Sequence, residues 1–316
     1  MKKIQNTDFM KSSLSRRRFI RSSALTLAGA GLMGQTGLIG QAAPFKMRSG
    51  RSADQKHLNV ITYNILAGRG WPQDRELAVR ARDRDQFSNR IALELSLYDP
   101  DIIAFQESPA EEVIQQIAHH LEMDYAFLPS AGNWPGAILT HHEIISYENV
   151  PIVTGSRPED LFTRHWGRAE IRLRNGDNLI VHSIHLYPHD NPESREIRTR
   201  EITEILNSME TDMRADASML VLADLNHTPQ MPEYEMWMAA GWKDTFAEAG
   251  SGNGYTINAA DPDRRIDYVL AYGPLSEQLS EARALFEGNF RTNPDDDRSF
   301  ALSDHLPHLA RFDLNS

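Results

Sequence analysis

The sequence predicts a mixed α/β sandwich, in which sheets and helices are layered around a shared apolar core. Two observations favour this class. In the first half, apolar strand patterns alternate with helical patterns, as at 58–66, 87–97 and 102–107. In the second half, strands follow one another directly, as at 168–173 and 179–186, whereas a parallel doubly wound sheet would alternate regularly. The length suits one large domain of this kind.

The elements of the first half are defined by residue pattern. The segment 58–66 is rich in β-branched and aromatic residues, which favour a strand that ends at Asn64. Phe87, Ile91 and Leu95 recur at helical spacing and predict a helix over 87–97. The same criteria predict a helix or loop at 74–85, a helix at 113–121, and strands at 102–107, 125–129, 137–140 and 144–147.

The most informative segment of the second half is 219–226, a continuous apolar run that ends in Asp224 and Asn226. Continuous hydrophobicity is typical of a strand covered on both faces. Side chains two apart on an extended strand point the same way, so this pair could address one ligand. An Asx-type turn before Pro229 is the alternative. Further elements are predicted at 168–173, 179–186, 194–213, 233–240, 265–270 and 309–314, with a surface loop at 288–299.

The N-terminus has the organisation of an export signal. Arg16 and Arg17 precede an apolar run over 24–39 that is rich in Gly and Ala, and small residues follow up to Ala42. The segment resembles a twin-arginine (Tat) signal, which implies passage through the Tat translocase to a periplasmic or secreted location. A membrane anchor is the alternative, although the run is only weakly hydrophobic. The expected organisation is a signal peptide at 1–42, a flexible lead-in at 43–56 and one domain at 57–316.

The charge balance weighs against long polyanions as substrates. The chain has 33 Lys and Arg and 44 Asp and Glu, and removing 1–42 takes away seven basic and one acidic residue, which leaves a net charge of −17. Such a surface would repel nucleic acid unless a basic groove is concentrated locally, and we find no dense Lys/Arg run. The absence of cysteine excludes disulfides, thiol catalysis and Cys-based zinc sites.

Polar residues follow several of the predicted apolar strands. Each has an ordinary structural explanation, such as a turn, a helix cap or a buried histidine with satisfied hydrogen bonds. Together, however, they form the inventory of a metal-assisted phosphoester hydrolase. The positions are Asn64, Glu107, His185, Asp224 with Asn226, Asp267, and the pair Asp304-His305 before the last strand.

Two of the three expected roles concern the metal and the water. Asn64, Glu107 and Asp304 would supply hard oxygen ligands, which suit Mg²⁺ or Mn²⁺. Asp224 and Asn226 would orient and deprotonate the attacking water.

The third role is electrostatic. His305, held in one tautomer by Asp267, would offset the charge that develops on the phosphoryl oxygens, and His185 would assist it. We therefore expect His185, Asp224, Asn226, Asp267 and His305 to form the catalytic set.

The polar residues lie in six short motifs. They are T-Y-N-I-L at 62–66, I-I-A-F-Q-E-S at 102–108, S-I-H-L at 183–186, L-A-D-L-N at 222–226, R-I-D-Y-V at 265–269 and S-D-H-L-P at 303–307. Each motif alone is weak, but six in this order are specific, and they resemble the endonuclease/exonuclease/phosphatase superfamily, whose fold is that of deoxyribonuclease I. The resemblance covers nearly all of the chain after the signal and implies a four-layer α/β/β/α sandwich of two mixed β-sheets.

The resemblance implies the same division of roles and adds one substrate-binding residue. Arg168 lies where many members place an arginine before the strand that ends in His-Leu. Ala223 is a departure, because many relatives have glycine before the aspartate, but the change in size is small. Trp71, Trp134 and Trp166 lie in loops beside the site strands and could line a stacking pocket, or pack those loops onto the core.

The expected activity is hydrolysis of a phosphoester on a small molecule or lipid headgroup, by in-line attack of water on phosphorus, and we expect a monomer. His185, where the abasic-site endonuclease branch has tyrosine, is closer to the phosphodiesterase and sphingomyelinase branches. Two alternatives stay open because a fold does not determine a function. One is a secreted nuclease, which the acidic charge disfavours, and the other is a catalytically silent binding module.

Overall fold

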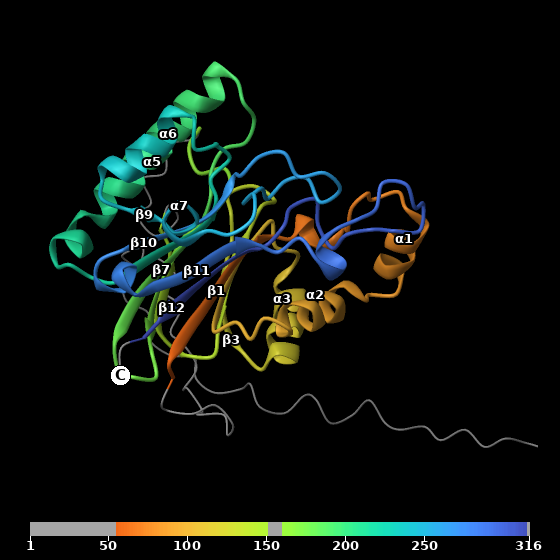
Figure 1. Cartoon of the computed structure of the whole chain (residues 1–316), viewed down its shortest axis with the longest axis horizontal. Helices are drawn as coiled ribbons and strands as arrows, with labels where there is room; N and C mark the ends of the chain where they lie inside the picture. The colour runs from red at the N-terminus through yellow and green to blue at the C-terminus, as the bar shows by residue number, and fades with distance from the viewer. Residues whose placement is uncertain (1–54, 151–159, 315–316) are drawn as a thin grey trace, which may run out of the picture. The chain divides into compact units, whose positions relative to one another are not determined.

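The computed structural model describes residues 55–150 and 160–314, and the predicted four-layer α/β/β/α sandwich is confirmed. The predicted signal peptide and most of the predicted lead-in lie outside these residues. Two six-stranded sheets form the inner layers. Helices α2 and α3 cover one of them, and α5 and α6 cover the other, on the opposite side of the sandwich (Figure 1).

Both sheets are mixed. The pairs β1–β2 and β7–β8 are parallel, and the other described strand pairs are antiparallel. The first sheet runs in the order β11 (Leu279–Ala284), β12 (His308–Asp313), β1 (His57–Asn64), β2 (Ile102–Gln106), β4 (Gly136–Thr140) and β3 (Asp124–Leu128). The second runs in the order β5 (Glu143–Asn149), β6 (Trp166–Arg172), β7 (Asn178–His185), β8 (Met219–Asp224), β10 (Asp267–Tyr272) and β9 (Lys243–Asp244).

Three apolar clusters fill the spaces between the four layers: one between the two sheets and one between each sheet and its helices. They arise because successive side chains of a strand point to opposite faces of the sheet. On β1, Val60 points between the sheets, whereas Ile61 points toward the outer helices. On β8, Leu222 packs between the sheets and Val221 packs against α5 and α6. The central strands are therefore apolar on both faces, as their continuous runs predict. The helices are α1 (Glu76–Asp83), α2 (Phe87–Ser96), α3 (Glu111–Leu121), α5 (Pro192–Arg214), α6 (Pro232–Ala239) and α7 (Thr245–Ala249).

Strand β11 is the main element that the sequence pattern missed. Its residues, L-S-E-A-R-A, include two charged side chains and none that is β-branched, and it is mostly half-buried. It is a strand because its backbone pairs with β12, which is a tertiary contact and not a local preference. Among the described residues, no helix is both long enough and apolar enough to span a membrane.

The sheet topology brings the polar strand ends to one edge of the sandwich. The parallel strands β1 and β2 end there, as do β7 and β8. Strands β10 and β12 run antiparallel to these neighbours, so they begin at the same edge. The side-chain amide of Asn64 donates to Asp224 at 3.0 Å, which joins the two sheets at this point.

Candidate active site

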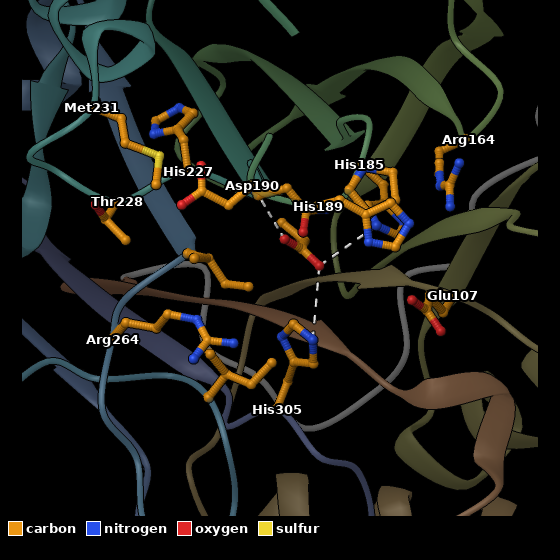
Figure 2. Close-up of a pocket in the computed structure, with 15 residues that line it drawn as sticks. Glu107, Arg164, His185, His189, Asp190, His227, Thr228, Met231, Arg264 and His305 are labelled. Atoms are coloured by element: carbon orange, nitrogen blue, oxygen red, sulfur yellow. Dashed lines mark hydrogen bonds and ion pairs between the residues drawn. The ribbon is translucent and has the colours of Figure 1, made fainter. Parts of the chain in front are cut away.

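Asp224 is the centre of the polar cluster at this edge. It lies at the end of β8, in register with His185 of parallel β7 and with Asp267 of antiparallel β10. It is 1 % exposed, and its Oδ2 lies 3.5 Å from His185 Nε2 and 3.9 Å from His305 Nε2. Figure 2 shows the rings of His185 and His305 pointing toward the same carboxylate, joined to it by dashed lines.

The environment of Asp224 favours its protonated form. Burial is the main cause, and the neighbouring charge of Asp267 adds to it, so the pKa of Asp224 is raised to about 7. The positive charge of His305 and the hydrogen bond from Asn64 oppose this shift. Asp224 is therefore a carboxylate whose pKa lies where a general base at neutral pH requires it.

His305 and Asp267 form a close pair. Nδ1 of His305 lies 2.9 Å and 3.2 Å from the two oxygens of Asp267, which is fully buried. Burial alone would lower the pKa of His305, but the Asp267 carboxylate, followed by Asp224 and Asp304, outweighs it and raises the pKa to about 10. At neutral pH His305 is thus a buried cation whose Nε2 faces Asp224.

His185 has the opposite electrostatic character. Burial, followed by the nearby His165 and Arg164, holds the pKa of His185 well below its usual range. The His165 ring lies behind it, with ring centroids 6.4 Å apart and His165 Nε2 3.0 Å from Ser183 Oγ. A neutral imidazole and a protonated one therefore flank the same carboxylate.

Glu107 stands at the end of β2 in a left-handed backbone conformation, with φ of 48°. Such a conformation is unfavourable for a glutamate and is often found at functional sites. Burial raises the pKa of Glu107, and its side chain accepts a hydrogen bond from Asn64 at 3.2 Å. Among the residues that the structure describes, Glu107 has no cationic partner within ion-pair distance. This half-buried carboxylate would therefore be stabilised by a bound cation.

These residues open onto a cavity of about 290 Å³ (Figure 2). Glu107, His185, Asp224, Asn226 and His305 all line it, whereas Asn64, Asp267 and Asp304 are not among the lining residues. Asp304 accepts a hydrogen bond from Ser303 at 3.3 Å and acts on the cavity through its charge, which contributes to the pKa shifts of Glu107 and His305.

The predicted substrate-binding residue Arg168 does not line the cavity. Its guanidinium pairs with Asp212 of α5 at 3.3 Å, because Arg168 faces His182 in the middle of β7 and not the strand end. Arg164, which precedes β6, lines the cavity instead and was missed from the sequence. Figure 2 shows Arg164 beside Glu107.

Arg164 is held between two aromatic rings. Its guanidinium carbon lies 5.4 Å from the ring centre of Trp134 and 5.3 Å from that of Tyr187. Nε is buried and has no hydrogen-bond partner among residues 55–150 and 160–314. Trp134, which was predicted to lie beside the site, contacts the cavity residue Arg164. Trp166 is instead buried in the apolar cluster under α5 and α6, and Trp71 packs against the cluster under α2 and α3.

Asn226 adopts a geometry different from the one predicted. Strand β8 ends at Asp224, and Asn226 has a left-handed conformation with φ of 52°, so the two side chains do not share the face of an extended strand. The backbone N–H of Asn226 donates to Asp224 Oδ1 at 3.1 Å, which is the Asx-type turn. Its amide donates to the carbonyl of Leu186 at 3.1 Å and still borders the cavity.

Helix α5 anchors the two loops that carry Arg164 and His189. The buried carboxylate of Glu201 accepts hydrogen bonds from the backbone N–H groups of Phe162 at 2.7 Å and Tyr187 at 2.9 Å. These bonds satisfy its oxygens, although burial raises the pKa of Glu201 to about 7.

Arg198, one turn earlier on α5, also binds the loop after β7. It is fully buried, pairs with Glu233 of α6 at 2.9 Å, and donates to the carbonyls of Tyr187 and His189. In the sequence, Arg195, Arg198 and Arg200 alternate with glutamates, and this pattern predicts a solvated helix face. For Arg198 the prediction is wrong, because α5 turns this side chain toward the loop after β7.

Two groups of donors could hold a divalent cation. Asp224, Asp267 and His305 offer ligand atoms within 4.8 Å of one another, but Asp267 is already bonded to a His305 that carries positive charge. Glu107 offers hard oxygen donors and has no cation in ion-pair contact among the described residues, and Asp304 adds negative charge nearby. Asn64 directs its NH₂ group at Glu107, and its amide oxygen, the donor it could offer to a cation, accepts a hydrogen bond from the N–H of Leu66 at 3.1 Å. The second group fits Mg²⁺ or Mn²⁺ better.

Comparison with known proteins agrees with this architecture. A family model described as "Endonuclease/Exonuclease/phosphatase family" matches residues 61–305. No curated protein matches the chain.

Several solved structures share the fold. An endonuclease/exonuclease/phosphatase from Bacteroides vulgatus has a TM-score of 0.62 and 18% identity, over 83% of this chain and 100% of that one. A mannosyl-6-phosphatase from Bacteroides thetaiotaomicron has a TM-score of 0.61 and 16% identity, over 80% and 98%. Truncated TDP2 from Caenorhabditis elegans has a TM-score of 0.58 and 17% identity, over 82% and 98%. At these identities the likeness shows the fold alone.

The raised pKa of Asp224 predicts that this residue, when ionised, destabilises the folded protein. Because the pKa of Asp224 is about 7 in the folded protein and ordinarily ~3.9, the contribution of this group to stability falls as pH rises from about 4 through 7. In EDTA, Asp224→Asn should therefore be more stable than the parent at pH 8, by roughly 1–3 kcal/mol, with a smaller gain at pH 5. Urea denaturation at both pH values measures this difference.

Asp244 provides a matched control, because it is as buried as Asp224 but forms an ion pair with Arg265. Burial alone would raise the pKa of Asp244, but two hydrogen bonds from Arg265, at 2.7 Å and 2.6 Å, lower it. Asp244→Asn should destabilise the fold by roughly 3 kcal/mol at pH 8, since it leaves Arg265 unpaired. Equal destabilisation by both substitutions would contradict the assignment of Asp224 as a strained carboxylate.

Proposed function

The chain belongs to the endonuclease/exonuclease/phosphatase family, and we propose on this basis that it is a metal-dependent phosphoester hydrolase. The observation that carries the proposal is the buried Asp224, with a pKa of about 7, set at a cavity between a neutral histidine and a protonated one. Packing alone does not account for such an arrangement, because buried carboxylates are costly without a compensating role.

The proposed reaction divides the work among the residues that line the cavity. Asp224 accepts a proton from water as the water oxygen bonds to phosphorus and the bond to the leaving oxygen breaks. His305, held protonated by Asp267, lies where its Nε2 can offset charge on the phosphoryl oxygens. His185 is neutral and can donate one N–H to a phosphoryl oxygen. Asn226, tied to Leu186, fixes the turn that positions Asp224.

A divalent cation, Mg²⁺ or Mn²⁺, would be held by Glu107 and Asn64, with Asp304 close by, and when bound would neutralise charge on the phosphate. The half-buried Glu107 carboxylate, without a cationic partner among the described residues, supports this assignment. A bound cation would also lower the pKa of Asp224 and Glu107, which would relieve the cost of their burial.

The cavity supports a small substrate. Its size of about 290 Å³ suits a sugar-sized or headgroup-sized ester, and Met231, Ile257 and Ile266 provide apolar surface for the group attached to phosphate. Arg164 and Arg264 lie at its edges and would bind further anionic oxygens. One solved protein of the same fold is a mannosyl-6-phosphatase, which is consistent with a small ester. Nucleic acid is the second candidate and is included in the test below.

The catalytic proposal predicts that Asp224→Asn and His305→Ala each lower kcat roughly 10²–10⁴-fold, because each removes a group that acts on the reacting atoms. The assay is hydrolysis of bis-p-nitrophenyl phosphate, p-nitrophenyl phosphate, sphingomyelin, an inositol phosphate and plasmid DNA, with Mg²⁺, Mn²⁺ or EDTA. Turnover of a small ester that EDTA abolishes is the expected result, and DNA cleavage alone would favour the nuclease. Activity that survives both substitutions would overturn the proposal.

The two arginines near β6 provide a matched pair for substrate binding. Arg164→Ala should raise KM roughly tenfold or more, because it removes a charged hydrogen-bond donor from the cavity edge. Arg168→Ala removes the same charge four residues away, where the side chain pairs with Asp212, and should leave KM within about twofold. The reverse ranking would restore Arg168 as the substrate-binding residue.

We also propose that the enzyme is exported by the Tat route, because residues 15–21 carry the twin arginine followed by an apolar run. Substituting Arg16 and Arg17 with lysine should leave the protein in the cytoplasm without altering the purified enzyme. Cell fractionation measures this, with Lys2 and Lys3 substituted by arginine as a control. Unchanged export of the Arg16→Lys/Arg17→Lys variant would exclude the Tat route.

A further inference from the structure

A second cavity, of about 400 Å³, lies between helices α1 and α2 and the loop 288–300. Figure 1 shows this loop beside α1. The lining is dominated by five arginines and includes no acidic residue. We call this cavity the arginine cleft, and the residues that define it are Arg80, Arg84, Arg90, Arg291 and Arg298.

The five arginines of the cleft differ in whether they form an ion pair. Arg80 pairs with Glu76 on the same helix. The other four arginines have no ion-pair partner within the described parts of the chain, 55–150 and 160–314. In a protein with an overall net charge of −11, four guanidinium groups without ion-pair partners around one cavity concentrate positive charge that would attract an anion.

Two of these arginines are oriented by aromatic rings. The guanidinium carbon of Arg90 lies 5.7 Å from the ring centre of Phe300, and that of Arg291 lies 5.9 Å from Phe286. Arg90 is also half-buried, and it donates to Gln86 at 3.4 Å. Stacking leaves the planar N–H edges available for an anion, so these groups are partly organised for binding before a ligand arrives.

The loop that forms one wall of the cleft is fastened to the helices. Glu94 of α2 accepts hydrogen bonds from the backbone N–H and the side-chain amide of Asn289, at 3.0 Å and 2.6 Å. Arg75 pairs with Asp297 at 2.9 Å. Trp71 and Ala301 exchange backbone hydrogen bonds at 2.9 Å and 2.7 Å. The cleft is therefore a defined site between tethered elements.

We propose that the arginine cleft binds a small molecule that carries two or more phosphate groups. Guanidinium groups match phosphate oxygens in paired hydrogen bonds, and several of them around one cavity match several phosphates. The size of the cleft suits a small ligand. The acidic remainder of the protein would repel a long polyanion that extends beyond the cleft, which favours the compact ligand over nucleic acid.

The proposal is independent of the proposed hydrolase activity, because the arginine cleft and the active-site cavity share no lining residue. Charge runs in the sequence do not reveal the cleft. Arg84 and Arg298 are separated by more than two hundred positions and by many acidic residues, and only the fold brings them together.

The test is calorimetric titration of the full chain with methylenediphosphonate, which has two phosphonate groups and resists hydrolysis, in EDTA. The variant Arg84→Ala/Arg298→Ala removes two exposed cleft arginines and should weaken binding at least tenfold. The control Arg172→Ala/Arg214→Ala removes the same charge from exposed pairs elsewhere, and should stay within twofold of the parent. Turnover of a small phosphoester should be unchanged in both variants.

Two outcomes would overturn the proposal. Because the active-site cavity also presents cations to an anion, both the stoichiometry and the affinity are compared. Equal stoichiometry and equal affinity of the cleft and control variants for the bisphosphonate would show that the arginine cleft does not bind it. Binding of a single-stranded oligonucleotide that depends on Arg84 and Arg298, without binding of the bisphosphonate, would make the cleft a nucleic-acid surface instead. Circular dichroism of both variants verifies that the fold is retained.

Discussion

The opposition of two buried carboxylates is the constraint on which the site depends. Asp224 and Asp267 face each other across neighbouring strands with almost no access to water. Two like charges in such a place cannot both be ionised at low cost. His305 eases the conflict by carrying positive charge beside Asp267. Burial, together with the charge of Asp267, still raises the pKa of Asp224 to about 7 although His305 opposes the shift, and this value suits a base. The chemistry therefore follows from strand register, since a shift by one residue would separate the two carboxylates.

Helix α5 links the stability of the outer layer to the shape of the cavity. Arg198 and Glu201 are buried polar residues, and their hydrogen bonds go to the backbone of the loops that border the site. Charged groups in such positions contribute little net stability, but a missing partner costs several kcal/mol. Their role is to specify one loop conformation, and thereby to hold Arg164 and the loop after β7 at the cavity.

The charge of this protein is unevenly distributed. The whole chain is acidic, but the active-site cavity and the arginine cleft both present cations: His305, Arg164 and Arg264 in the first, and the guanidinium groups of five arginines in the second. Net charge governs long-range repulsion, whereas binding within a few ångströms depends on the residues that line the cavity. An acidic composition is therefore compatible with anionic ligands, provided that they are small enough to lie inside a cavity.

The α/β class and the positions of the polar strand ends could be predicted from residue patterns alone. A strand end is a local feature, because an apolar run that stops at Asn64, Glu107 or Asp224 shows where a buried strand ends. Other features of the site depend on contacts between segments far apart in the chain. Arg164 and not Arg168 lines the cavity because pairing with β7 fixes how far each lies from the strand end. Strand β11 and the arginine cleft depend on contacts between distant segments, and no local pattern records which distant residues meet.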